Sequence, residues 1–396
     1  MIEINPATPE AHLKLADSLF ELGKFDEAIK HYRIAIGHKP GLVAAHVALG
    51  NAFSAAGRPN EALKSFLDAA ALNPGNAGIH FNIGNAYAVL EQFESAIERF
   101  SEALRLQPAF ESARVNLGIA LKYSGHFEAA IETLTRVNVP ESRSMILECL
   151  LRLKRYDDFF AMVERDKGLD EVNLHSAAIS AYAAQQLERD DPHPFCPDAF
   201  KYIRVIDNPG GIDDSKGLLD ELVRAAKALP TVYEPQHVST IKGFQTVGIN
   251  LFENATGPFA ILEGIIKAEI DRYYAEVRLE STAFARKWPR KASLSAWYVE
   301  LLAGGYQGAH IHPGGWLSGV IYLRTPAEAE GSAAGRIEFL LKGDSYPTIV
   351  DEGPGKVFEP RPGRLMLFPS SLHHRTIPFK SSDERLCIAF DLRPHY

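Results

Sequence analysis

A period of 34 residues runs through the first third of the chain and limits the folds open to it. Glycine, alanine and proline each recur with this spacing, at Gly50, Gly84 and Gly118, at Ala28, Ala62, Ala96 and Ala130, and at Pro40, Pro74 and Pro108. Each unit of such a period is one supersecondary element that cannot bury its apolar face alone, so neighbouring units must stack. The pattern therefore predicts an array of repeats and not a single closed core.

Each unit resembles a tetratricopeptide repeat (TPR), which is a pair of antiparallel helices. The resemblance places the starts of four repeats at about Pro9, Val43, Ala77 and Glu111. It implies an all-α TPR superhelix over residues 1–140. Because the pattern frays after Pro140, we expect a degenerate repeat, a capping helix and a Pro-rich linker over residues 141–196.

Asparagines recur at two fixed positions of these repeats, as the pairs Asn51 with Asn85 and Asn82 with Asn116. An amide side chain can both donate to and accept from a peptide backbone. By resemblance to superhelical TPR proteins, the four are candidate contacts for a protein or peptide on the concave face. Asparagine is also common in the TPR consensus at both positions, so a structural role is the alternative.

Composition and charge indicate which classes of partner and which cellular compartment to expect. The net charge of −8 and the pI near 6.0 disfavour a nucleic-acid partner, which usually requires a basic surplus. The three cysteines, Cys149, Cys196 and Cys387, have no metal or disulfide spacing and fit a reducing compartment. The N-terminal stretch has no apolar run of signal or membrane length. We therefore expect a cytoplasmic protein with neither a nucleic-acid nor a membrane partner.

From about residue 197 to 396 the pattern changes from helical to mixed. Helices are expected over 214–229 and 258–277, and a strand over 244–252. A series of short strands separated by glycine and proline follows, which is typical of a jelly roll with bracing helices.

Two histidines stand one residue apart in GGYQGAHIHPGGWLSGVIYL, at the end of an expected strand. His310 and His312 can share a face, because alternate side chains of an extended chain point the same way. Neutral imidazole is the commonest protein ligand for transition metals, so the pair is a candidate half-site. With fourteen histidines in the chain, a chance H-x-H pair is the alternative.

A second stretch, HHRTIPFKSSDERLCIAF, is expected to hold two strands joined by a polar turn. If the turn is Lys380–Asp383, an antiparallel hairpin sets Thr376 opposite Cys387 and lets His374 and Arg385 point into the same space. The two would then be roughly 13 Å apart along the ladder. A five-carbon dicarboxylate, bound to a metal at the histidine and to the guanidinium at its other end, fits that gap.

These residues resemble the 2-oxoglutarate- and Fe(II)-dependent oxygenases, which combine H-x-[D/H], a distal His and an Arg about ten residues further on. More narrowly, AHIHPGGWLSGVIYL, FPSSLHH and ERLCIAFD resemble the 2OG-Fe(II) oxygenase family often found behind TPR repeats, from roughly Phe200 onward. The resemblance implies a double-stranded β-helix, with Fe(II) held by His310, His312 and His374. It also implies that Arg385 binds 2-oxoglutarate and that O2 is a cosubstrate.

The family pattern F-P-S-x-L-x-H selects His374, and its neighbour His373 would point to the opposite face. The chain departs from the wider superfamily at His312, where an aspartate is usual; a neutral ligand leaves the metal site one unit more positive. It also departs at Cys387, which replaces the serine of the R-x-S pattern that begins here with Arg385.

Three hydroxyl groups are candidate contacts for the cosubstrate. Thr376, opposite Cys387 in the expected register, could replace the missing serine hydroxyl. Tyr298 and Tyr322 lie on expected strands and could donate as well, although an aromatic side chain on a strand is usually part of the core.

The resemblance implies a dioxygenase that hydroxylates a protein or peptide recruited by the TPR array. Two alternatives remain open. One is a cupin-like enzyme with three histidine ligands that does not use 2-oxoglutarate, although Trp316 and Leu317 stand where a cupin glutamate would be. The other is a TPR adaptor with a catalytically inactive barrel.

Overall fold

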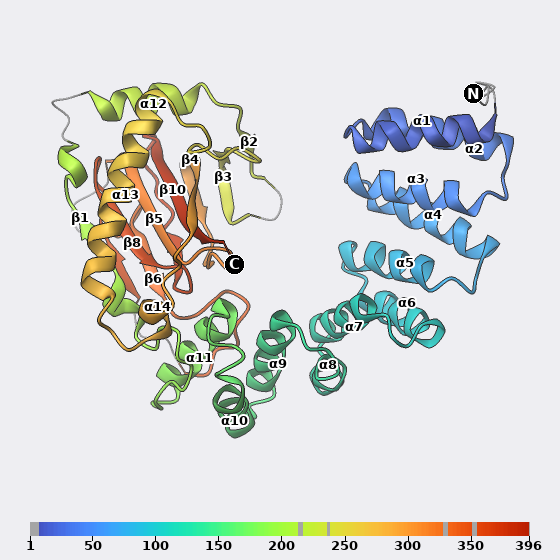
Figure 1. Cartoon of the computed structure of the whole chain (residues 1–396), viewed down its shortest axis with the longest axis horizontal. Coiled ribbons are helices and arrows are strands. Elements are labelled where there is room, and N and C mark those ends of the chain that lie inside the picture. Colours follow the sequence, from blue (N-terminus) through green and yellow to red (C-terminus); the bar gives the residue numbers. More distant parts are fainter. Residues whose placement is uncertain (1–7, 213–216, 236–237, 328–331, 351–354, 396) are drawn as a thin grey trace. The chain divides into compact units, whose positions relative to one another are not determined.

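The computed structural model describes residues 8–212, 217–235, 238–327, 332–350 and 355–395 of the 396-residue chain. It divides the chain into two compact units, Met1–Leu153 and Lys154–Tyr396. The first is helical and the second is rich in antiparallel sheet (Figure 1). The division falls inside the segment 141–196, so the place where the repeat domain ends remains a prediction. No helix in the described ranges is both long and apolar enough to span a membrane.

The N-terminal unit is a series of antiparallel helix pairs. Its helices are α1 (Pro9–Glu21), α2 (Phe25–His38), α3 (Val43–Ala55), α4 (Pro59–Leu72), α5 (Ala77–Val89), α6 (Phe93–Leu106), α7 (Glu111–Tyr123), α8 (Phe127–Leu134) and α9 (Pro140–Arg152). The first helix of each of the four repeats starts at the residue predicted from the 34-residue period.

Packing explains why glycine recurs in the first helix of a repeat. A Cβ on Gly84 would lie 2.6 Å from the ring of Phe100, a buried residue of the second helix. Gly118 meets Leu134 in the same way. Because protein interiors are close-packed, the large residue of one helix leaves room only for glycine on the other, and the spacing of the pair repeats every 34 residues.

The C-terminal unit contains two antiparallel sheets together with helices and short 3-10 turns. Its helices and turns are α10 (Tyr156–Asp166), α11 (Leu174–Gln186), η1 (Ala199–Tyr202), η2 (Pro209–Gly211), α12 (Leu218–Lys227), α13 (Gly257–Val277) and α14 (Ala283–Arg286). Its strands are β1 (Arg204–Ile206), β2 (Val232–Tyr233), β3 (Thr240–Gln245), β4 (Ala292–Gln307), β5 (Leu317–Arg324), β6 (Ile337–Leu340), β7 (Lys356–Phe358), β8 (Leu365–Pro369), β9 (His373–Thr376) and β10 (Arg385–Pro394).

The larger sheet has the order β1-β8-β5-β10-β4-β3-β2, and the smaller has the order β7-β6-β9. From β7 onward, successive strands alternate between the sheets: β7 and β9 lie in the smaller sheet, and β8 and β10 lie in the larger one. Crossings of this kind between two antiparallel sheets are typical of a jelly roll, which stays a prediction for this unit. Within residues 214–229 the structure describes α12 from Leu218, and residues 213–216 lie outside the described part of the chain.

The hairpin expected between β9 and β10 is wrong. Thr376 pairs with Ile337 of β6, whereas Cys387 pairs with Val299 of β4 and Tyr322 of β5. The segment between the two strands is not a tight turn, because Phe379 within it is fully buried and its carbonyl accepts the N–H of Gly304. The connection crosses from one sheet to the other, so β9 and β10 do not pair.

The strand expected over 244–252 is also shorter than predicted, because β3 ends at Gln245. Gly248 has a positive φ of 70°, which takes the chain out of the extended conformation. The side chain of Asn250 then accepts hydrogen bonds from the N–H groups of Phe252 and Ala296, at 3.1 and 2.9 Å. The segment remains joined to β4 by the Asn250 side chain together with a backbone bond, from Leu251 N–H to Ala296 O at 2.9 Å.

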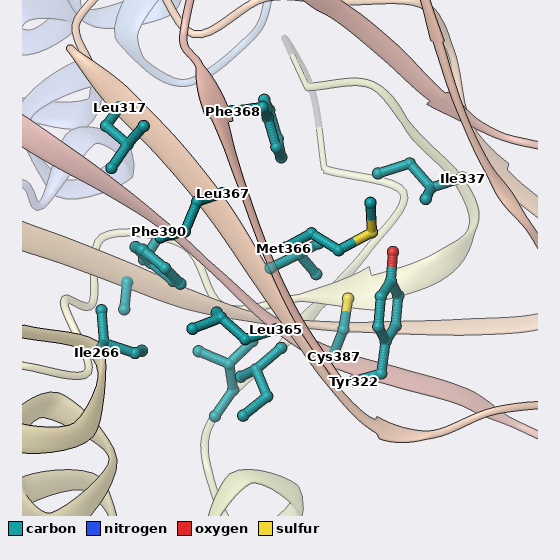
Figure 2. Packing of buried hydrophobic residues seen from close by; sticks show 14 of the residues in the cluster. Ile266, Leu317, Tyr322, Ile337, Leu365, Met366, Leu367, Phe368, Cys387 and Phe390 are labelled. Atoms are coloured by element: carbon teal, nitrogen blue, oxygen red, sulfur yellow. The ribbon is translucent and has the colours of Figure 1, made fainter. Parts of the chain in front are cut away.

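The larger sheet has two differently covered faces. Tyr322, Cys387 and Met366 project to the side where Ile337 of the smaller sheet lies (Figure 2). Leu365 and Phe390 project to the opposite side, toward Ile266 of α13 (Figure 2). The space between the sheets is the interior of the unit, and the other face of the larger sheet is braced by helix.

Candidate metal centre

Three imidazoles come together at one end of this interior. His310 and His312 lie in the loop between β4 and β5, and His374 lies on β9. Their candidate ligand nitrogens all lie within 4.8 Å of one another. The backbones of His310 and His374 exchange two hydrogen bonds, of 3.2 and 3.1 Å, so the two side chains must be neighbours.

On each of the three rings the close hydrogen bond is made by Nδ1. Nε2 of His310 has one long contact, 3.4 Å from Ser239 Oγ, whose hydroxyl can donate to it. Nδ1 contacts an oxygen that can only accept: Gly308 O for His310 at 2.7 Å, Leu372 O for His374 at 3.2 Å, and Asp391 Oδ1 for His312 at 2.6 Å. Each Nδ1 must therefore donate to its oxygen, and in a neutral ring this tautomer leaves the lone pair on Nε2. Three imidazole nitrogens at this spacing fit a divalent transition metal.

Burial favours the neutral form of two of these rings. It lowers the pKa of His310 to about 4, and the neighbouring His312 adds to the effect. It lowers the pKa of His374 well below its ordinary value, again with His310 and His312 contributing. A neutral imidazole is the form that binds a metal, so neither ring has to lose a proton first near pH 7.

His373 does not join the cluster. It lies on the other face of β9, where its ring contacts that of Tyr346 at a centroid distance of 5.2 Å. Its side chain is buried, and its Nδ1 has no hydrogen-bond partner in the described structure. Burial lowers its pKa to about 3.

Arg385 lies in the same interior, at the start of β10. It is 2% exposed, although it carries a permanent charge. Its Nε donates to Gly335 O at 3.1 Å, whereas its terminal nitrogens have only long contacts, 3.5 Å to Tyr322 Oη and 3.9 Å to Cys387 Sγ. Among the described residues, Arg385 forms no salt bridge. A buried guanidinium without a carboxylate partner fits an anionic ligand.

The structure treats the three candidate hydroxyls differently. Tyr322 lies beside Arg385, whose guanidinium stands over its ring at 5.0 Å. Thr376 is buried on the face of β9 that also carries His374. Tyr298 is not brought to this interior: it pairs with Ile388 on the helix-covered face, and its hydroxyl donates to Glu300 at 3.0 Å.

The four candidate asparagines lie on first helices of the repeats, in the N-terminal unit. The amide of Asn116 donates to Asn85 Oδ1 at 2.7 Å, which links α7 to α5. Asn82 is half-buried and Asn51 is exposed. Asn51 is therefore the member of the set whose amide is most accessible to a partner.

Sequence reasoning missed Asp391, which lies behind His312 and is 4% exposed. A signal was present. Asp391 stands six residues after Arg385 on the same expected strand, so the two share a face, and an acidic residue on an interior face needs a partner.

Comparison with known families agrees with this division of the chain. Residues 295–391 match the family described as "Putative 2OG-Fe(II) oxygenase", and residues 3–43 and 47–109 match the tetratricopeptide repeat family. The chain thus carries a 2OG-Fe(II) oxygenase family domain at its C-terminal end, preceded by TPR repeats.

Solved structures similar to part of the chain include three with low identity. The MamA protein is 19% identical over 41% of this chain and 95% of its own, with a TM-score of 0.37. The pilF protein of Pseudomonas aeruginosa is 21% identical over 47% and 86%, with a TM-score of 0.39. YrrB, a TPR protein with an unusual peptide-binding site, is 16% identical over 47% and 95%, with a TM-score of 0.39. No curated protein matches the chain.

Replacing His373 with leucine should flatten the pH dependence of stability in metal-free protein. The pKa of His373 is about 3 in the folded state and about 6.5 in an unfolded chain. Below pH 6.5 the unfolded state binds the extra proton, so native stability falls as pH falls, by about 1.4 kcal/mol per unit. Between pH 6.5 and pH 5, the free energy of unfolding of His373→Leu should fall by about 2 kcal/mol less than that of the wild type.

The measurement is denaturant unfolding of the C-terminal unit within the full chain, with a chelator present. Above pH 7.5 the free energy of unfolding should change with pH equally in the two proteins, which serves as the internal control. Equal slopes between pH 5 and 6.5 would contradict the burial of a neutral His373.

Proposed function

We propose that this chain is an Fe(II)- and 2-oxoglutarate-dependent dioxygenase that hydroxylates a protein or peptide recruited by its TPR repeats. The observation that carries the proposal is the pairing of two features in one interior. Three imidazoles have candidate ligand nitrogens within 4.8 Å of one another, and a buried guanidinium without a salt bridge among the described residues lies between the same two sheets.

His310, His312 and His374 would hold the iron, and three protein ligands leave other positions of the metal open. Bound Fe(II), together with 2-oxoglutarate and O2, supplies the oxidising power to hydroxylate an unactivated C–H bond. The part of the protein is positioning. The Nδ1 contacts fix the orientation of each ring before any ligand arrives.

Arg385 would orient the cosubstrate through its far carboxylate. A guanidinium bonds a carboxylate with two parallel N–H donors, and such charge-assisted bonds strengthen where water is excluded. The hydroxyl of Tyr322, whose oxygen lies 3.5 Å from a terminal nitrogen of Arg385, can act as a further donor to the same carboxylate. Cys387 takes the place of the usual serine and has only a weak thiol, so the tyrosine is the better second donor.

Aromatic side chains shield the reacting end of the interior. The rings of Phe368 and Phe339 lie 4.7 and 6.1 Å from that of His374, and the ring of Trp297 lies 5.4 Å from that of His312. Excluding water in this way strengthens the polar contacts inside and limits side reactions of an oxidising centre.

Recruitment of a protein or peptide is supported by the TPR match and by the asparagines of the first helices. TPR units stack into extended surfaces suited to long segments of a partner. An exposed amide such as that of Asn51 can bond a peptide backbone without demanding a particular sequence.

The test of this function is succinate release. Full-length protein incubated with Fe(II), 2-oxoglutarate, O2 and lysate fractions should release succinate, because 2-oxoglutarate is consumed as substrate is hydroxylated. His310→Ala should abolish the release, since it removes one metal ligand. His373→Leu should retain the release, because His373 is next to His374 in sequence but lies outside the metal cluster. Equal succinate from wild type and His310→Ala would contradict an iron-dependent reaction.

Replacing Arg385 with alanine should abolish 2-oxoglutarate binding and leave metal binding intact. Removing one partner of a buried charge pair costs about 2–5 kcal/mol, so the dissociation constant should rise by roughly 30-fold or more. Equilibrium titration with Fe(II), then with 2-oxoglutarate, measures both. Arg324→Ala, at the exposed end of β5, is the control and should bind both ligands normally.

The same titration separates the three functions considered for this chain. The proposed dioxygenase binds both ligands, a three-histidine metalloenzyme of another type binds metal only, and an inactive barrel binds neither. Unchanged 2-oxoglutarate affinity in Arg385→Ala would show that the cosubstrate binds elsewhere.

A further inference from the structure

A buried carboxylate stands directly behind one of the three histidines. Asp391 Oδ1 lies 2.6 Å from His312 Nδ1, and the side chain of Asp391 is 5% exposed. The two residues are 79 positions apart in sequence and are brought together by the pairing of β10 with β5. The contact is a property of the fold and not of a local motif.

Other groups hold the carboxylate in place. The fully buried hydroxyl of Ser318 donates to the same oxygen at 2.8 Å, and it lies 2.8 Å from the hydroxyl of Ser370. Gly315 leaves the space for them: a Cβ there would lie 2.6 Å from Ser370 Oγ and 3.1 Å from Asp391 Cγ. Several segments thus converge on a fixed acceptor.

Of the three clustered imidazoles, only that of His312 has a carboxylate as its hydrogen-bond acceptor. The Nδ1 atoms of His310 and His374 donate to neutral backbone carbonyls, whereas that of His312 faces a carboxylate. The remaining oxygen of Asp391 has Arg393 as its ion-pair partner, at 3.8 Å, and the side chain of Arg393 is 52% exposed. A cation so exposed is well solvated and neutralises the carboxylate only weakly.

His312 occupies the position at which the wider oxygenase superfamily carries an aspartate. With a histidine there, the ligand set is uncharged and the metal site is one unit more positive. We propose that Asp391 supplies the missing negative charge through His312, acting as a positioning residue that makes this imidazole a stronger donor to the metal. The inference rests on the proposed metal site, and it explains how an H-x-H site can serve in place of H-x-D.

The physical basis is the coupling between the two nitrogens of an imidazole. A carboxylate that accepts the Nδ1 proton fixes the tautomer and raises the basicity of Nε2. The charge is delivered across the ring instead of by direct coordination. Loss of such an acceptor typically lowers metal affinity by about 10- to 100-fold.

The test replaces Asp391 with asparagine, which keeps the shape of the side chain and removes its charge. Co(II) is the probe, because its absorption spectrum reports the strength of its ligands. Asp391→Asn should bind Co(II) about 10- to 100-fold more weakly than the wild type, with a shifted spectrum. Asp344→Asn is the matched control: Asp344 accepts the backbone N–H of Ala309, beside His310, and among the described residues it bonds no imidazole. It should match the wild type.

A charge-exchange pair distinguishes this role from a merely structural one. His312→Asp alone places two carboxylates side by side and should bind Co(II) worse than His312→Asp combined with Asp391→Asn. In the double variant the carboxylate introduced at position 312 binds the metal directly and supplies the negative charge. The affinity for Co(II) should therefore recover toward that of the wild type. A double variant weaker than both single variants would overturn the proposal.

The outcomes separate this inference from the proposed function. If the wild type binds no Co(II) or Fe(II), the metal site and the inference fail together. If the wild type and Asp391→Asn bind equally with the same spectrum, only the inference fails. Should Asp391→Asn not fold, proton NMR of the Zn(II)-loaded wild type replaces it. An exchange-protected, far-downfield resonance from His312 Nδ1–H supports the proposal, and its absence overturns it.

Discussion

Two backbone hydrogen bonds between His310 and His374 hold the candidate site together. They join the loop after β4 to β9, which lies in the other sheet, and so place a residue from each side of the interior in contact. The side chain of His312 lies on the same side as that of His310, because the two are separated by one residue. Because the bonds belong to the backbone, the convergence of the imidazoles depends on closure of the two sheets and not on any bound ligand.

β10 gives the interior two electrically different ends. Arg385 and Asp391 lie on the same face of this strand, six residues or roughly 20 Å apart, and both are almost fully buried. The acidic end faces His312 and the metal cluster, and the basic end faces Tyr322. A dicarboxylate that bridges a cation and a guanidinium suits such a polarity, and unlike charges buried at opposite ends also fix its direction.

Patterns of short range were predictable, and pairings across sheets were not. The 34-residue period gave the starts of α1, α3, α5 and α7, because glycine and its large partner are repeated together. Strand parity and the family motif separated His374 from His373. The hairpin register was wrong because it assumed that β9 and β10 pair, whereas these two strands lie in different sheets. Asp391 escaped notice for the same reason, since only the β5–β10 pairing brings it to His312.

The most direct measurement is X-ray absorption at the iron edge of the full-length protein loaded with Fe(II) alone. If the three imidazoles bind as described, the spectrum should show three histidine nitrogens among the ligands, and His374→Ala should remove one of them while His373→Leu removes none. A spectrum with only oxygen ligands, or one unchanged in His374→Ala, would contradict the metal centre.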